Sequence, residues 1–168
     1  DTTSMGVEAA RLALRHAPRD TVPADVVFAT TTPAYADKTN ATAIHAALSL
    51  DDSAMAFDML GSNRSGAGVL RAAADAGRPT LAVIADIRTG LPGGGDERDG
   101  GDAAVAFLLA PGDAQAPVIA EHVASASASA EFLERWRIPG DPASRQWEER
   151  FGEHAYVPLA DAAITSAL

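Results

Sequence analysis

The sequence predicts an α/β fold in which a mixed, mainly parallel β-sheet lies between layers of helices. Helix-like and strand-like segments alternate over residues 1–112. The strand-like segments are continuous apolar runs without polar alternation, which is typical of parallel strands buried on both faces. Apolar residues make up 47% of the chain but aromatic residues only 5%, which indicates a core built mostly from small aliphatic side chains.

The first helix is predicted over residues 3–16 and is expected to end at Pro18, because proline cannot continue a helix. Spacings of three and four residues place several of its apolar side chains on one face. The residues expected to share that face are Met5, Ala9, Leu12 and Ala13.

Short apolar runs rich in β-branched residues predict four strands, at residues 25–30, 54–59, 80–86 and 103–110. A second helix is predicted over residues 40–50, with Asn40 or Thr39 as its N-cap. A third helix is predicted over residues 65–77 and is closed by Gly77.

The character of the chain changes after residue 112. We expect residues 1–112 to form an α/β half-domain, and residues 113–168 to form an ordered excursion and a final helix of the same domain. The segment at 118–131 begins like a strand and becomes low in complexity. The final helix is expected to have Pro158 near its first turn.

Composition excludes several kinds of protein. The formal net charge is −10, with 23 acidic and 13 basic residues, which argues against a nucleic-acid partner. No cysteine is present, which rules out disulfides, zinc-thiolate sites and a cysteine nucleophile. No apolar run is long enough to span a membrane, and no leader opens the chain, so we expect a cytoplasmic protein. Because the chain begins within a helix, we expect it to be a piece of a longer protein.

The best candidate site is the turn from Gly61 to Gly66, where a strand runs into a helix. The amides that open a helix favour an anion or a developing oxyanion. Ser62 is a candidate nucleophile, although it lacks the G-x-S-x-G spacing and has no histidine close in sequence. The alternative is a helix cap, in which Ser62 or Asn63 bonds the amides of the first turn.

The other polar clusters predict no metal or phosphate site. The glycine-rich loop at 90–101 has neither the P-loop nor the EF-hand spacing, and is expected to be a flexible turn. The four histidines stand far apart, and none shares a helix face with another ligand at a suitable spacing. They are His16, His45, His122 and His154.

Both tryptophans lie among arginines in the segment 132–158. One interpretation is a nucleotide site that combines ring stacking with phosphate pairing. Burial of the tryptophans against the domain or a partner is the interpretation that we favour. The residues concerned are Trp136, Trp147, Arg135, Arg137, Arg145 and Arg150.

The order of the motifs resembles the amino-terminal half of the thiolase superfamily, nearest the 3-hydroxy-3-methylglutaryl-CoA (HMG-CoA) synthases and the ketoacyl synthase III enzymes. The resemblance covers nearly the whole chain. It rests on TSMGVEAARLAL, DVVFATTTP, AFDMLGSNRSGAGVLRAA, TLAVIADI and GGDAAVAFLLA, and on the tail SAEFLERWRIPGDPASRQWEERFGEHAYVPL. It implies that residues 1–112 are half of a thiolase-like fold. The strand that opens the family's fold and the second half with its catalytic histidine are not among these residues.

The resemblance also implies roles for residues around the turn. The family's reactive cysteine comes five residues after the aspartate that corresponds to Asp58, and this position is occupied by Asn63. An asparagine cannot form the acyl-thioester on which condensation depends. Asp58 and Asp102 would be structural, and Ser62 would stand beside the catalytic position. The substrate-binding candidates are Arg64, Ser65 and Gly66. The alternative for Arg64 is a surface arginine that binds no ligand.

The resemblance implies a CoA thioester as substrate and no covalently bound cofactor. The last strand of the half would have an uncovered edge, so we expect a homodimer or other self-association. An OB-fold, zinc-ribbon protein is a possible partner. Three functions remain open: a fragment of an acyltransferase with Asn63 at the cysteine position, a non-catalytic or degenerate acyl-CoA-binding subunit, and an aldol-type lyase with catalytic groups in the missing half.

Overall fold

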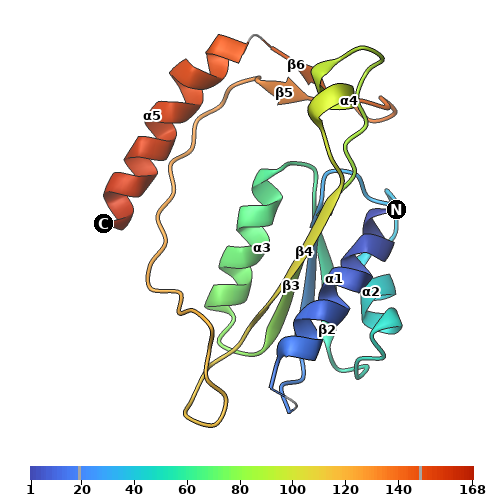
Figure 1. Ribbon diagram of the computed structural model, residues 1–168, viewed down its shortest axis with the longest axis vertical. Coiled ribbons are helices and arrows are strands. Elements are labelled where there is room, and N and C mark those ends of the chain that lie inside the picture. The colour runs from blue at the N-terminus through green and yellow to red at the C-terminus, as the bar shows by residue number, and fades with distance from the viewer. Residues whose placement is uncertain (19, 148) are drawn as a thin grey trace. The chain divides into compact units, whose positions relative to one another are not determined.

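The computed structural model describes residues 1–18, 20–147 and 149–168 (Figure 1). The chain folds into two compact units, each of which combines two segments. Unit 1 comprises Asp1–Ile87 and Asp102–Glu121, and unit 2 comprises Arg88–Gly101 and His122–Leu168. The division of the chain at residue 112 stays a prediction.

Unit 1 contains one four-stranded mixed sheet in the order β2-β1-β3-β4. Strands β1, β2 and β3 are parallel, and β4 runs antiparallel to β3. The mainly parallel sheet predicted from the continuous apolar runs is therefore confirmed. The strands span Asp25–Thr30 (β1), Met55–Leu60 (β2), Thr80–Asp86 (β3) and Ala103–Leu109 (β4).

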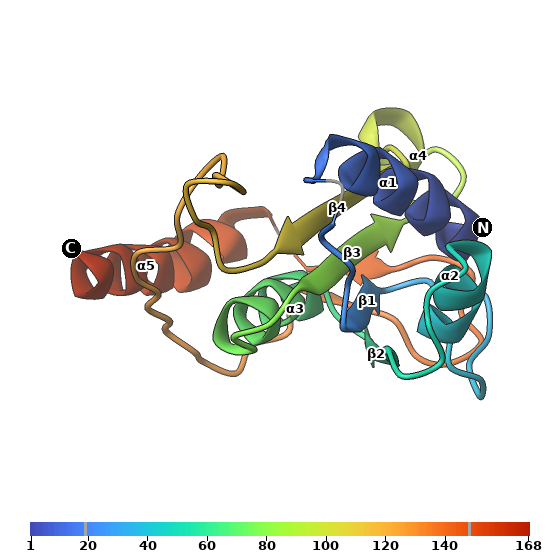
Figure 2. The ribbon, with the colours of Figure 1, turned by 90° about the horizontal axis from the view of Figure 1, so that it is seen from below.

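Helices cover both faces of this sheet, as the buried strands predict (Figure 2). Helices α1 (Thr2–His16) and α2 (Ala41–Ala47) pack on one face, and α3 (Arg64–Asp75) packs on the other. Each helix lies within two residues of its predicted bounds, apart from the carboxyl end of α2. Gly77 follows α3 with φ of +65°, a left-handed conformation that glycine adopts without strain and that commonly ends a helix.

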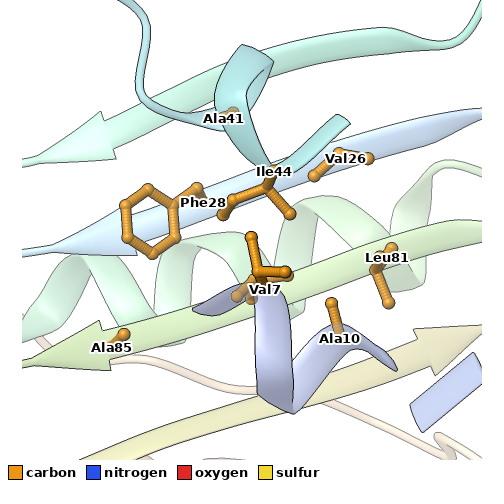
Figure 3. Packing of buried hydrophobic residues seen from close by; sticks show 9 residues of the cluster. Val7, Ala10, Val26, Phe28, Ala41, Ile44, Leu81 and Ala85 are labelled. Atoms are coloured by element: carbon orange, nitrogen blue, oxygen red, sulfur yellow. The ribbon is translucent and has the colours of Figure 1, made fainter. Parts of the chain in front are cut away.

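The main core lies between the sheet and the helices α1 and α2 (Figure 3). Its side chains are mostly small or aliphatic, with Phe28 as the one aromatic ring in the cluster. The buried members are Val7, Ala10, Val26, Phe28, Ala41, Ile44, Leu81, Val83 and Ala85. A smaller cluster under α3 joins Val27, Ala29 and Val69. Burial of this kind contributes roughly 25 cal/mol for each Å² of apolar surface.

The face of α1 that packs on the sheet agrees with the predicted one only in part, because Met5 and Ala13 pack against the core but Leu12 does not. Val7 and Ala10 are buried, whereas Leu12 is 50% exposed. Gly6 explains the difference, because a Cβ there would lie 3.1 Å from Val83 and 3.2 Å from Ile44. The helix therefore approaches the sheet along its glycine, and the larger apolar residue Leu12 is left at the side.

A buried carboxylate fixes the amino ends of the parallel strands. Asp25 opens β1, is 3% exposed, and accepts hydrogen bonds from Arg78 Nε at 2.6 Å and Nη2 at 3.0 Å. The hydroxyl of Thr80 donates to the same carboxylate at 3.2 Å. These contacts join β1 to β3, and the hydrogen bond with Asp25 raises the pKa of Arg78.

Unit 2 contains the short helix α4 (Gly95–Asp99), the two-stranded hairpin β5 (Arg135–Trp136) and β6 (Arg145–Gln146), and the helix α5 (Glu149–Ala167). The carboxylate of Asp96 in α4 accepts hydrogen bonds from both guanidinium ends of Arg135, at 2.5 and 3.0 Å. This ion pair links two segments that lie 39 residues apart in the sequence.

The structure also corrects three predictions for residues 90–101 and 118–168. The loop at 90–101 contains a helix and is not simply a flexible turn, because Glu97 accepts from the Gly93 amide and Asp96 pairs across the unit. No strand forms in 118–131. Pro158 lies inside α5 and not in its first turn, because α5 begins at Glu149, nine residues before the proline.

No helix among the described residues is long and apolar enough to cross a membrane.

Candidate functional site

The candidate turn lies where β2 ends and α3 begins, as the sequence predicts. β2 ends at Leu60 and α3 begins at Arg64. Gly61 has φ of +109°, a conformation that side chains rarely adopt, and its amide donates to the carbonyl of Thr30 at 3.3 Å. Because Thr30 ends β1, the turn lies at the carboxyl edge of the parallel strands. Ligands of open α/β sheets bind at this edge.

Asn63 occupies the N-cap position of α3, and its side chain makes no hydrogen bond to the first-turn amides. The position expected for a cap is correct, but for Asn63 the expected side-chain bond is wrong. The amides of Ser65 and Gly66 instead donate to the carbonyls of Ser62 and Asn63, at 3.0 and 3.1 Å. Residues Gly61–Arg64 are exposed, which leaves the Asn63 amide group at the tip of the turn accessible to a ligand.

Asp58, three residues before the turn, holds the start of α2. Its two carboxylate oxygens accept the backbone amides of Asn40 and Ala41, each at 2.7 Å. The Asn40 side-chain amide donates to the same carboxylate at 3.1 Å. A residue of β2 therefore satisfies amides at the amino end of a helix, where unpaired donors otherwise remain.

A second polar cluster at this edge was not predicted from the sequence. Asp86, at the end of β3, accepts from the hydroxyl of Thr30 at 3.1 Å, from the amide of Thr31 at 2.6 Å and from its hydroxyl at 2.9 Å. The sequence feature that could have indicated this cluster is an aspartate at the end of the apolar run of β3, together with threonines at the end of the run of β1. Their meeting depends on β1 and β3 being neighbours, which the sequence pattern alone does not give. The cluster fixes the backbone where β1 leaves the sheet.

The loop after β1 places a cation at the same edge. Lys38 Nζ lies 5.3 Å from the centroid of the Tyr35 ring and donates to the carbonyl of Thr39 at 3.0 Å. Asn40, which is fully buried, accepts from the Tyr35 amide at 3.1 Å and donates to the carbonyls of Tyr35 and Lys38. The loop is thus held by hydrogen bonds to its own backbone.

The histidines of unit 1 do not reach the turn. His16 ends α1, and the ring Nε2 of His45 pairs with the carbonyl of Asp51 at 3.0 Å. Both lie toward the edge at which the parallel strands begin, opposite the turn. Among the described residues of unit 1, no imidazole therefore stands beside Ser62 as a base. No group of histidine and carboxylate side chains suited to a metal ion occurs in the described part of the chain.

The remaining predicted residues belong to the start of β4 and to unit 2. Asp102 directly precedes β4 and is exposed. In unit 2, Arg135 is engaged by Asp96, which leaves it unavailable for a nucleotide phosphate. Trp136 and Trp147 lie with ring centroids 6.5 Å apart, and Trp147 is 57% exposed, so the expected burial of this tryptophan does not occur within the chain.

Two shallow hollows lie on the described surface. One is a shallow apolar groove of about 460 Å³ along α1 and Ala104, and the other, of about 420 Å³, lies near the carboxyl end of α1. The residues that line these two hollows include none from the turn.

Comparison with solved structures identifies the fold. The chain is similar to MvaS in complex with HMG-CoA, with a TM-score of 0.79 and 20% identity over 97% of this chain. It is similar to an HMG-CoA synthase complexed with CoA, with a TM-score of 0.80 and 16% identity over 99%. It is also similar to the HMG synthase of the curacin biosynthetic pathway in complex with an acetyl donor-ACP, with a TM-score of 0.80 and 18% identity over 98%.

These likenesses show that the chain has half of a thiolase-like fold, which confirms the resemblance at the level of fold. The chain spans 40–43% of the length of the three neighbours. No protein-family model matches the sequence, and no curated protein is similar to it in sequence.

Proposed function

We propose that the chain is the amino-terminal half of an HMG-CoA synthase-like or ketoacyl synthase-like protein, and that its β2–α3 turn binds the acyl group of a CoA thioester without covalent attachment. The observation on which this rests is the place of Asn63. It stands at the exposed N-cap of α3, at the carboxyl edge of the sheet, in half of a thiolase-like fold. By resemblance, this is the position of the cysteine that takes up the acyl group.

Two features favour a CoA thioester as the ligand. The neighbours in the same fold include complexes with HMG-CoA and with CoA. The Asn63 side chain also offers both a donor and an acceptor, which suit the carbonyl and amide groups of an acylated pantetheine arm. Arg64, Ser65 and Gly66 follow in the first turn of α3 and are the proposed substrate-binding residues.

Non-covalent binding follows from the chemistry of the side chains. An asparagine amide is not a nucleophile, and Ser62 has no imidazole beside it among the described residues of unit 1. The usual first step, in which a thiolate attacks the acyl carbonyl and displaces CoA, therefore lacks its nucleophile in this chain. Carbon–carbon bond formation would need groups from the rest of the protein.

The test is to restore the thiolate in the full-length protein. Asn63→Cys places a thiol at the start of α3, where the helix dipole lowers the thiol pKa. We expect incubation with acetyl-CoA to give a mass increase equal to one acetyl group on the peptide containing residue 63. Ser62→Cys is the matched control, because it places a thiol in the same exposed turn one residue earlier, and it should acetylate more slowly.

Equal acetylation of the two variants would contradict the assignment of residue 63, because it would reflect only thiol exposure. An acyl adduct on Ser62 of the wild-type protein would also overturn non-covalent binding, and would favour a serine-based enzyme.

A further inference from the structure

Lys38 is the only lysine in the chain. No carboxylate among the described residues lies within 4.0 Å of its ammonium group, which contacts only the Tyr35 ring and the Thr39 carbonyl. The side chain is exposed. In a chain of net charge −10, an isolated ammonium is a local point of attraction for an anion.

The backbone that presents Lys38 is held in place from beneath. Asn40 is fully buried and donates to the Lys38 carbonyl at 3.2 Å and to the Tyr35 carbonyl at 3.0 Å. The amide of Tyr35 donates back to Asn40 at 3.1 Å. Both residues of the cation–π pair are thus anchored to one buried side chain. A fixed backbone narrows the region that the Lys38 ammonium can reach, and so lowers the ordering cost when a ligand binds.

The same anchor joins Lys38 to the candidate turn. Asn40 is bonded to Asp58 through its backbone and its side chain. Asp58 lies on β2, and the strand continues directly into the turn that contains Asn63. The loop with Lys38 follows β1, which pairs in parallel with β2, so the loop and the turn leave the sheet at the same edge.

We propose that Lys38 binds a phosphate group of the thioester ligand, at the far end of the pantetheine arm whose acyl group lies at the turn. This inference rests on the proposed function. A compact ammonium with three donors suits phosphate oxygens. Phosphate joined to pantetheine occurs both in CoA and in the prosthetic arm of carrier proteins, and the shared group is the phosphopantetheine phosphate.

The test compares three thioesters on the full-length protein by calorimetry: acetyl-CoA, acetyl-phosphopantetheine and acetyl-pantetheine. Lys38→Met removes the charge and keeps the length of the side chain. We expect it to weaken acetyl-CoA binding roughly tenfold, the size of one charge-assisted hydrogen bond, and to leave acetyl-pantetheine binding unchanged. Lys38→Arg should retain most of the affinity. Raising the salt concentration should weaken wild-type binding more than binding by the Lys38→Met variant.

Acetyl-phosphopantetheine distinguishes the two sources of phosphate. If its binding weakens together with that of acetyl-CoA, Lys38 contacts the phosphate that carrier proteins also have. If only acetyl-CoA binding weakens, Lys38 contacts the nucleotide phosphates of CoA. Either result supports a phosphate contact at Lys38.

Arg71→Met is the matched control, because this substitution changes the net charge by the same amount. Arg71 is exposed on α3 and pairs with Asp75. The inference is wrong if Lys38→Met lowers affinity no more than Arg71→Met does, or lowers it equally for acetyl-pantetheine. Failure of the wild-type protein to bind any of the three thioesters would instead overturn the proposed function.

Discussion

Asp58 connects the residues of the candidate site to one another. Its carboxylate accepts three hydrogen bonds from Asn40 and Ala41, and Asn40 in turn holds the loop with Lys38. Asn63 follows five residues later at the tip of the turn. The Asp58 side chain thereby links the loop after β1 to β2, the strand that leads into the turn before α3.

Asp58→Ala should destabilise the protein by about 2 kcal/mol, because it leaves the amides of Asn40 and Ala41 without their acceptor. Urea unfolding with the midpoint and the slope both reported measures this change. Asp75→Ala is the control, since it removes an exposed carboxylate that pairs with Arg71 on the same helix, and it should cost no more than about 0.5 kcal/mol. Similar losses for the two variants would show that Asp58 has no special structural part.

The helices and strands of unit 1 were predictable to within a few residues, whereas their contacts were not. Continuous apolar runs gave the bounds of β1 and β3, and Gly77 marked the end of α3. The packed face of α1 was predicted correctly for Met5 and Ala13 but wrongly for Leu12, because close approach to the sheet is decided by Gly6. Hydrophobic periodicity shows which side chains are apolar. It does not show which helix face lets the backbone approach the sheet most closely.

Gly6→Val should destabilise the protein by roughly 1–3 kcal/mol, because the added side chain meets Val83 and Ile44 and forces α1 away from the sheet. Gly101→Val is the matched control, since a Cβ at Gly101 meets nothing within 4 Å. Thermal unfolding of both variants measures the difference. A Gly6→Val protein as stable as the Gly101→Val protein would contradict the packing described for α1.

The polar part of the site was predictable only in outline. The strand–turn–helix pattern located Asn63 correctly at the start of α3. The cluster around Asp86 escaped prediction because it joins the ends of β1 and β3, and their meeting depends on the strand order. The bonds of Asp58 to Asn40 and Ala41 were not predicted because these partners precede it by 18 and 17 residues. The Asp96–Arg135 pair of unit 2 escaped for the same reason, since its partners are distant in the sequence.

At the scale of the whole molecule, the chain offers unpaired strand edges. Strands β2 and β4 are the outer strands of the sheet, and β4 exposes Val105 at 42% and Phe107 at 44%. Exposed apolar edge strands invite pairing with another chain. Self-association therefore stays our prediction for this protein.

Phe107→Lys should shift the protein toward the monomer, because a charge on an outer strand opposes pairing between sheets. Sedimentation velocity over a range of protein concentrations measures the change. Arg71→Lys, which leaves the charge of an exposed helix position unchanged, is the control. A wild-type protein that sediments as a monomer at every concentration would contradict self-association.

The central claim is that the β2–α3 turn binds an acyl thioester without a covalent step. Its most direct test is calorimetric titration of the full-length wild-type protein with acetyl-CoA, followed by intact-protein mass spectrometry of the same sample. We expect saturable binding, no acetyl adduct, and weakened binding in the Asn63→Ala variant. The absence of binding, or a stable adduct on the wild-type protein, would contradict the claim.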